Sequence, residues 1–152
     1  MTGETILLVD DGEDDRFFMR TACAAAKFTS PLQEVNDGEE AIAYFQGVGK
    51  YSDRKLFPLP AVVLLDLNMP RKNGFDVLTW VRAYEGLRRL SIIVMSASQR
   101  EDDISRAFDL GATAYLVKPG TLPELVEMMS SLRAWLRFNH FPPLNRSVKT
   151  RA

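Results

Sequence analysis

Short apolar runs are the feature that most constrains the fold of this chain. Residues 61–65, Ala-Val-Val-Leu-Leu, would be apolar on both faces of a strand, a pattern typical of a central strand in a parallel sheet. The other apolar runs are also too short for a helix, and each is followed by a segment of helical composition. The predicted strands are residues 5–9, 32–35, 61–65, 91–95 and 114–117. This alternation predicts an α/β fold, a doubly wound parallel sheet with helices on both faces.

The segments between the strands carry helix start and stop signals. The predicted helices are residues 14–26, 37–45, 75–82, 98–110 and 121–136. Three of them open with a capping residue followed three positions later by glutamate: Asp37 with Glu40, Ser98 with Glu101, and Thr121 with Glu124. Asp14 and Asp15 are explained as acids of a first helical turn. Residues 47–60 are expected to form a loop at the amino-terminal edge of the strand at residues 61–65.

Composition limits the chemistry that this chain can perform. Its 152 residues suffice for one domain, expected at residues 1–138, with a short tail at 139–152 and no output domain. Lys and Arg number 19 and Asp and Glu 20, a balance that argues against a nucleic-acid surface. No apolar run approaches the roughly 18 residues of a membrane span. Cys23 is the only cysteine and His140 the only histidine, which excludes a multi-cysteine zinc site and a histidine-rich metal site. We expect a soluble, cytoplasmic protein that uses carboxylates, hydroxyls and lysine.

Polar side chains follow the predicted strands at the points where they end. In order along the chain they are Asp10 and Asp11, Asp66, Ser96 and Lys118. Ligands of parallel α/β sheets bind outside the carboxyl ends of the strands, so these residues should meet at one edge. Each has an ordinary explanation alone, as a cap, a turn former or a solvated charge, but their joint occurrence favours a site. Three carboxylates repel unless a cation joins them, and oxygen ligands suit Mg²⁺. A lysine and a hydroxyl beside them suit a phosphoryl group.

Four motifs in this order resemble the receiver domains of two-component response regulators. They are residues 8–11 (Leu-Val-Asp-Asp), 64–70 (Leu-Leu-Asp-Leu-Asn-Met-Pro) with Gly74, 94–97 (Val-Met-Ser-Ala) and 111–119 (Gly-Ala-Thr-Ala-Tyr-Leu-Val-Lys-Pro). The resemblance covers about residues 6–136. It implies a flavodoxin-like fold with a five-stranded sheet in the order 2-1-3-4-5.

The resemblance also implies a phosphoryl-transfer role for three residues. Asp66 matches the phosphoacceptor, which takes a phosphoryl group from a sensor histidine kinase. Ser96 and Lys118 match the hydroxyl and the lysine that contact the phosphoryl oxygens. Such a protein is not an enzyme acting on other molecules: it catalyses only its own phosphotransfer and dephosphorylation, and it signals through protein contacts in a phosphorelay.

Metal and switch residues are implied in the same way. Asp10, Asp11 and Asp66, with the backbone carbonyl of Asn68, match the ligands of Mg²⁺. Tyr115 matches the aromatic residue that changes rotamer on activation, and Ser96 takes part in the same switch.

Departures from the family pattern narrow the resemblance. Gly120 stands where the family usually has an aromatic residue, and residues 47–60 form a longer loop than in typical receivers. Asn68 and Ser98 occupy positions at which the family tunes the dephosphorylation rate. The long loop, the tryptophan in the last helix and the Pro-Pro tail are similar to stand-alone response regulators associated with bacterial phytochromes, so a phytochrome-type kinase is the expected partner.

Two other functions remain open from the sequence. A Mg²⁺-dependent phosphatase that forms an aspartyl phosphate has similar residue types, but it needs an acid two positions after the nucleophile, where this chain has Asn68. A degenerate receiver used only for docking is a second alternative. All of the matched site residues are present, which argues against it.

The last predicted helix carries two apolar surfaces. Leu125, Met129, Leu132 and Leu136 form a stripe that should face the sheet. Met128 and Trp135 fall on its flank, and Phe138 extends that flank outward. Exposed apolar surface of this kind often marks an interface, so we expect a symmetric homodimer through this helix and the tail. The alternative is that the tail folds back and covers the flank within one molecule.

Overall fold

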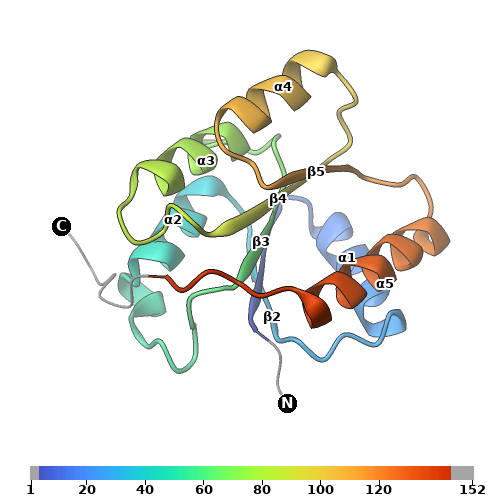
Figure 1. The fold of residues 1–152 in the computed structure, drawn as a ribbon, viewed down its shortest axis with the longest axis horizontal. Coiled ribbons are helices and arrows are strands. Elements are labelled where there is room, and N and C mark those ends of the chain that lie inside the picture. Colours follow the sequence, from blue (N-terminus) through green and yellow to red (C-terminus); the bar gives the residue numbers. More distant parts are fainter. Residues whose placement is uncertain (1–3, 145–152) are drawn as a thin grey trace.

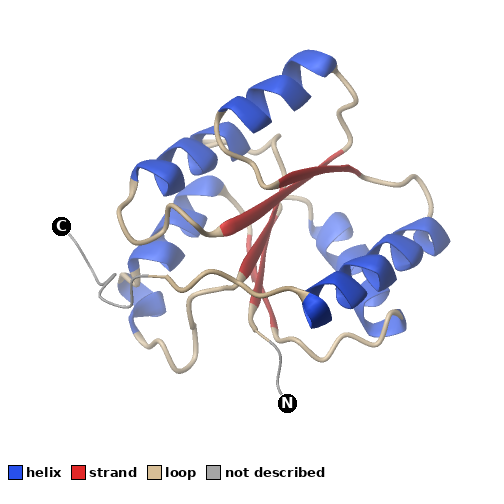
Figure 2. Cartoon of the chain, in the orientation of Figure 1, coloured by secondary structure: helices blue, strands red, loops and turns tan. Residues whose placement is uncertain are grey.

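The structure, a computed structural model, describes residues 4–144, which form a five-stranded parallel sheet between two layers of helices. The strands are β1 (Ile6–Val9), β2 (Leu32–Val35), β3 (Val62–Leu65), β4 (Ser91–Ser96) and β5 (Ala114–Val117). Neighbouring strands are parallel, in the order β2-β1-β3-β4-β5. Figure 2 shows the strands, in red, with helices on either side of them. The doubly wound, flavodoxin-like sheet expected from the sequence is therefore confirmed.

The helices divide between the two faces of the sheet. They are α1 (Glu13–Ala25), α2 (Gly38–Gln46), α3 (Gly74–Ala83), α4 (Glu101–Asp109) and α5 (Leu122–Phe138), with a short 3-10 helix, η1 (Gly49–Ser52). Helices α1 and α5 pack together on one face, while α2, α3 and α4 lie on the other (Figure 1).

Burial on both faces explains why the strands are apolar throughout. Leu7 and Val9 of β1 belong to the core cluster under α2 and α3, whereas Ile6 and Leu8 belong to the cluster under α1 and α5. Successive side chains of a strand point to opposite faces, so every position of β1 enters one core or the other. Burying each such side chain contributes about 1.5–3 kcal/mol. Strand β3 is buried in the same way over its full length.

The strand register brings the predicted site residues to one edge. Val9 of β1 pairs with Leu65 of β3, and Leu65 pairs with Val94 of β4. Asp10 and Asp66 are each the next residue after a paired strand end, and Ser96 is the last residue of β4, paired with Val117. The carboxyl ends of β1, β3, β4 and β5 therefore present these side chains at the same edge of the sheet.

Two of the predicted helix caps form. The Asp37 carboxylate accepts a hydrogen bond of 2.7 Å from the Glu40 backbone N–H, and Gly47 ends α2 with a φ of 68°, in the left-handed region that glycine adopts without strain. The Thr121 hydroxyl accepts one of 3.3 Å from the Glu124 N–H. These contacts fix where α2 and α5 begin.

The capping box predicted at Ser98 is wrong. Helix α4 begins at Glu101, and its cap residue, Arg100, makes no side-chain hydrogen bond to the helix. The Ser98 hydroxyl instead donates 2.6 Å to the Asp103 carboxylate and accepts from the Arg100 N–H. Ser98 thus orders the turn before the helix, a use of serine that competes with capping. The other predicted boundaries lie within one or two residues of the observed ones.

The loop at residues 47–60 is tied firmly to α2. The buried Tyr51 ring packs against Tyr44 and Phe57, with its centroid 5.0 Å from the centroid of each ring. The Arg54 guanidinium donates to the backbone carbonyls of Tyr44, Phe45 and Phe57 at 2.7, 2.7 and 3.1 Å. The loop leads into the amino-terminal end of β3, as predicted, and so lies at the edge away from Asp66.

Residues 139–144 run from the end of α5 along the amino-terminal edge of the sheet (Figure 1). Phe141 packs against the core cluster under α1 and α5, and Leu144 against the cluster on the other face. The division between a domain at 1–138 and a tail at 139–152 stays a prediction, because residues 145–152 lie outside the described part. Among residues 4–144, no helix has the length and apolar character that crossing a membrane requires.

Candidate functional site

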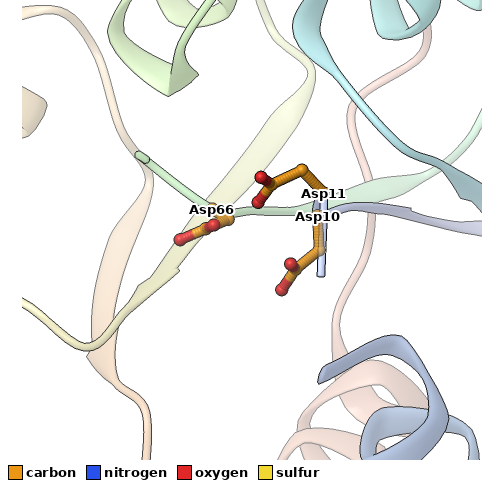
Figure 3. A group of neighbouring side chains, drawn as sticks. All are labelled: Asp10, Asp11 and Asp66. Atoms are coloured by element: carbon orange, nitrogen blue, oxygen red, sulfur yellow. The ribbon is translucent and has the colours of Figure 1, made fainter. Parts of the chain in front are cut away.

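Three carboxylates meet at the carboxyl edge of the sheet. One oxygen from each of Asp10, Asp11 and Asp66 lies within 4.8 Å of the others, and the three side chains gather in front of the ends of β1 and β3 (Figure 3). Asp10 and Asp66 are buried, with 3% and 9% of their surface exposed, whereas Asp11 is open to solvent. Carboxylate oxygens are the ligands of hard divalent cations, so these residues fit such an ion.

Hydrogen bonds and close packing fix the Asp10 carboxylate and the backbone of both buried acids. The Asp10 carboxylate accepts 2.9 Å from the Gly12 N–H, and the Asp10 carbonyl accepts 2.7 Å from the Arg16 guanidinium. The backbone N–H of Asp66 continues the sheet to Val9, at 2.9 Å. Gly74 of α3 packs directly on the Asp66 carbonyl, since a Cβ at this glycine would lie only 2.4 Å from that oxygen.

Lys118 provides the positive charge of the site. Its ammonium donates 2.8 Å to the Asp10 carboxylate and 3.1 Å to Asp15, and it lies 3.8 Å from the Asp66 carboxylate. Burial alone would lower the pKa of Lys118, but the hydrogen bond to Asp10 and the charges of Asp66 and Asp10 outweigh it and raise the pKa. Lys118 is therefore a permanent cation among acids.

The surroundings of Asp66 disfavour its ionised form relative to an exposed aspartate. Burial raises the pKa of Asp66 from 3.8 to about 6, and the charge of Asp10 adds to this effect. The Lys118 charge and a hydrogen bond from the Asn68 backbone act in the opposite direction. A divalent cation beside the carboxylates would favour the charged form, which agrees with the fit of the donor set.

Ser96, Ser98 and Tyr115 form a connected group beside the acids. Ser96 is fully buried at the end of β4, and its hydroxyl accepts 3.1 Å from the Ser98 N–H. The Tyr115 hydroxyl donates 2.9 Å to the Ser98 carbonyl. Tyr115 thus links β5 to the segment between β4 and α4, and this segment begins at the site.

Asn68 lies in the turn between β3 and α3 with its residue surface exposed. Its backbone N–H donates a hydrogen bond to the Asp66 carboxylate, so this turn folds over Asp66. The predicted residues from the ends of β1, β3, β4 and β5 are therefore brought to one edge, as the sequence indicated.

Asp15 is a site residue that the sequence did not reveal. It lies in the first turn of α1, as predicted, but its carboxylate also accepts from Lys118. The available signal was its place in a helix that starts two residues after the acid pair, because the first turn of such a helix lies beside the strand end.

Comparison with known proteins agrees with this geometry. The family profile of the response regulator receiver domain matches residues 6–130. Response regulator Rcp1 of Synechocystis sp. (strain ATCC 27184 / PCC 6803 / Kazusa) is 31% identical over 134 residues, covering 88% of this chain and 89% of Rcp1. The chain therefore belongs to the family of response regulator receiver domains.

Solved structures of similar proteins extend the comparison. The phosphorylated cyanobacterial phytochrome response regulator RcpA has a TM-score of 0.84 and 30% identity, covering 93% of this chain and 99% of that one. Response regulator RPA3017, from red light signaling of R. palustris, has a TM-score of 0.84 and 35% identity, with coverage of 95% and 99%. The Mn²⁺-bound form of Rcp1 has a TM-score of 0.80 and 31% identity, with coverage of 91% and 99%.

Proposed function

We propose that this protein accepts a phosphoryl group on Asp66 from a sensor histidine kinase and signals through protein contacts. The observation that carries the proposal is the position of the Lys118 ammonium, 2.8 Å from Asp10 and 3.8 Å from Asp66, within a group of three carboxylates. A buried carboxylate with a fixed cation beside it and a hydroxyl at the next strand end is equipped to receive a phosphoryl group.

In the proposed transfer, an oxygen of the Asp66 carboxylate forms a bond to the phosphorus of a phosphohistidine. The bond between phosphorus and the imidazole nitrogen breaks, and its electron pair remains with the imidazole. Lys118 and Ser96 are placed to bind the phosphoryl oxygens, and the Asp66 carboxylate is the nucleophile, so no separate base is needed. Asp10, Asp11, Asp66 and the Asn68 carbonyl would hold Mg²⁺, which when bound supplies positive charge for the phosphoryl oxygens.

The added charge is proposed to act on α4 and β5. An aspartyl phosphate carries more negative charge than a carboxylate, so the Ser96 hydroxyl and the Lys118 ammonium would be drawn toward it. Ser96 accepts from Ser98, and Ser98 accepts from Tyr115. A movement of Ser96 would therefore displace the segment that leads into α4 and the Tyr115 side chain bonded to it. Ser96 and Tyr115 are the proposed switch residues.

A phytochrome-type histidine kinase is the proposed partner. RcpA, a similar structure, is a cyanobacterial phytochrome response regulator. Helix α1 starts beside the acid pair and exposes Phe17 and Phe18, with 56% and 46% of their surfaces accessible. Exposed aromatic surface next to the phosphoacceptor suits the docking of a kinase. We also propose that the transfer takes place in the cytoplasm.

A phosphatase acting on other molecules remains the weaker candidate. Asn68, two positions after Asp66, is an amide and cannot protonate a leaving group. We therefore propose that the site catalyses only the gain and loss of its own phosphoryl group.

We also propose that α5 forms a homodimer interface. Trp135 and Phe138 are 39% and 75% exposed on α5. Phe141 packs edge-on against Trp135, with ring centroids 5.8 Å apart, so the tail covers part of this surface and leaves the rest open. The solution mass across concentration, for the native protein and Trp135→Ala, tests this. Dimers weakened by the substitution would support it, and a native protein that stays monomeric would reject it.

The phosphoacceptor proposal is tested with acetyl phosphate and Mg²⁺. Intact-mass measurement should show one added phosphoryl group on the native protein and none on Asp66→Asn. Labelling of this variant to the native extent would refute the assignment. Steady release of inorganic phosphate from unrelated phosphate esters would favour a phosphatase.

A further inference from the structure

Asp15 places a fourth carboxylate next to the three at the strand ends. Its Oδ2 atom accepts a hydrogen bond of 3.1 Å from the Lys118 ammonium, while Asp10 accepts one of 2.8 Å from the same nitrogen. Glu13 and Asp14, also in the first turn of α1, are exposed and make no ion pair with any described residue. Asp15 is thus distinguished from its neighbours by its contact with a proposed phosphoryl-binding group.

The hydrogen bonds of the Lys118 ammonium indicate what its contact with Asp15 does. An ammonium group has three N–H donors, and two are taken by Asp10 and Asp15. The Asp66 carboxylate lies 3.8 Å from the same nitrogen, beyond hydrogen-bond distance, so the third donor is left for a group attached to Asp66. We propose that Asp15 is a positioning residue that keeps Lys118 ready for the phosphoryl group and holds its ammonium back from a direct hydrogen bond to Asp66.

Gly12 supplies a second, independent observation. A Cβ at this position would lie 3.3 Å from the Asp15 carboxylate, closer than most Cβ atoms pack, and 3.4 Å from the Asp10 carboxylate, at the short end of ordinary contact. A glycine at position 12 therefore spares the Asp15 carboxylate a tight contact at the place where it meets Lys118. Its N–H also holds the Asp10 carboxylate, at 2.9 Å.

The expected effect is modest because Asp15 is half exposed, with 54% of its side chain accessible. Without its acceptor, the Lys118 ammonium can close the gap to Asp66 or extend into solvent, and either movement slows phosphoryl capture. An ion pair of this exposure corresponds to about a two- to fivefold change in rate. This inference rests on the proposed function, because it concerns the same transfer to Asp66.

Three variants test the inference: Asp15→Ala, Asp15→Asn and the matched control Asp14→Ala. The asparagine keeps an oxygen acceptor for Lys118 but removes the charge, whereas Asp14→Ala removes the same charge from the same helical turn without touching Lys118. We expect labelling by acetyl phosphate to slow about two- to fivefold in Asp15→Ala relative to the control, and Asp15→Asn to restore most of the rate. A purely structural role in α1 would change the melting temperature without this rescue.

A second measurement needs neither a phosphoryl donor nor a metal ion. In the metal-free protein, the side-chain ammonium protons of Lys118 should exchange with water faster in Asp15→Ala than in Asp14→Ala, as measured by NMR. Equal labelling rates in these two variants, or an Asp15→Asn protein as slow as Asp15→Ala, would overturn the role of Asp15. A native protein that takes up no phosphoryl group would instead overturn the proposed function, so the two failures are distinguishable.

Discussion

Replacing Asp66 with asparagine should stabilise the metal-free protein near pH 8. Burial raises the pKa of Asp66 from 3.8 to about 6, so holding this carboxylate ionised costs the folded state about 3 kcal/mol. Asp66→Asn keeps the shape and removes the charge. We expect its free energy of unfolding to exceed that of the native protein by about 2–3 kcal/mol at pH 8, which would raise the urea midpoint by about 1–2 M.

The pH dependence has a definite sign. The folded native protein takes up a proton on Asp66 near pH 6, whereas the unfolded chain does so only near pH 3.8. Stability of the native protein should therefore rise as the pH falls through this window, and the advantage of Asp66→Asn should vanish near pH 4. Asp109→Asn, an exposed carboxylate on α4, is the control and should change stability by less than about 0.5 kcal/mol. Equal stability of the native protein and Asp66→Asn at pH 8, or an advantage that persists unchanged at pH 4, would refute the reasoning.

Three further substitutions test other parts of the structure. Asp11→Ala should weaken Mg²⁺ affinity and slow labelling together, because metal and nucleophile share one site; titration followed by Trp80 fluorescence measures the first, and an unchanged affinity would contradict it. Arg54→Ala should lower the free energy of unfolding by about 2–4 kcal/mol through loss of its bonds to three carbonyls, yet leave labelling intact; loss of labelling in the folded variant would show that the loop reaches the site. Gly74→Ala should lower the free energy of unfolding by about 1–3 kcal/mol and slow labelling, because its Cβ would lie 2.4 Å from the Asp66 carbonyl oxygen. A variant that unfolds at the same temperature as the native protein would contradict this packing.

The sheet could be predicted from sequence because its strands are buried on both faces. Any polar residue inside residues 62–65 would enter one of the two cores, so the chain had little freedom there. The positions of the site residues followed from the sheet, since parallel strands end at one edge. Their chemical roles stay predictions until the phosphoryl transfer is measured.

Local hydrogen bonding was harder to predict where one residue type has several uses. Serine both caps helices and orders turns, and Ser98 takes the second use because Asp103 accepts from its hydroxyl. Asp15 fitted the ordinary explanation of a first-turn acid, and its contact with Lys118 depends on a residue 103 positions away. For residues 47–60 the sequence predicted a loop but not its ordered conformation. The Arg54 contacts that order this loop are made to carbonyls of α2 and form only when that helix is folded.

The segment at residues 139–144 has a consequence for the order in which the molecule is completed during synthesis. Phe141 packs against the core on one side of the sheet and Leu144 against the core on the other, although both come after every strand and helix of residues 4–144. Each core therefore lacks one of its covering side chains until this segment has left the ribosome, so the nascent chain exposes apolar surface on both sides of the sheet after α5 has been made. A chain stopped after Phe138 would keep both surfaces exposed at once, and chaperone dependence and protease sensitivity should rise together in such a truncated protein.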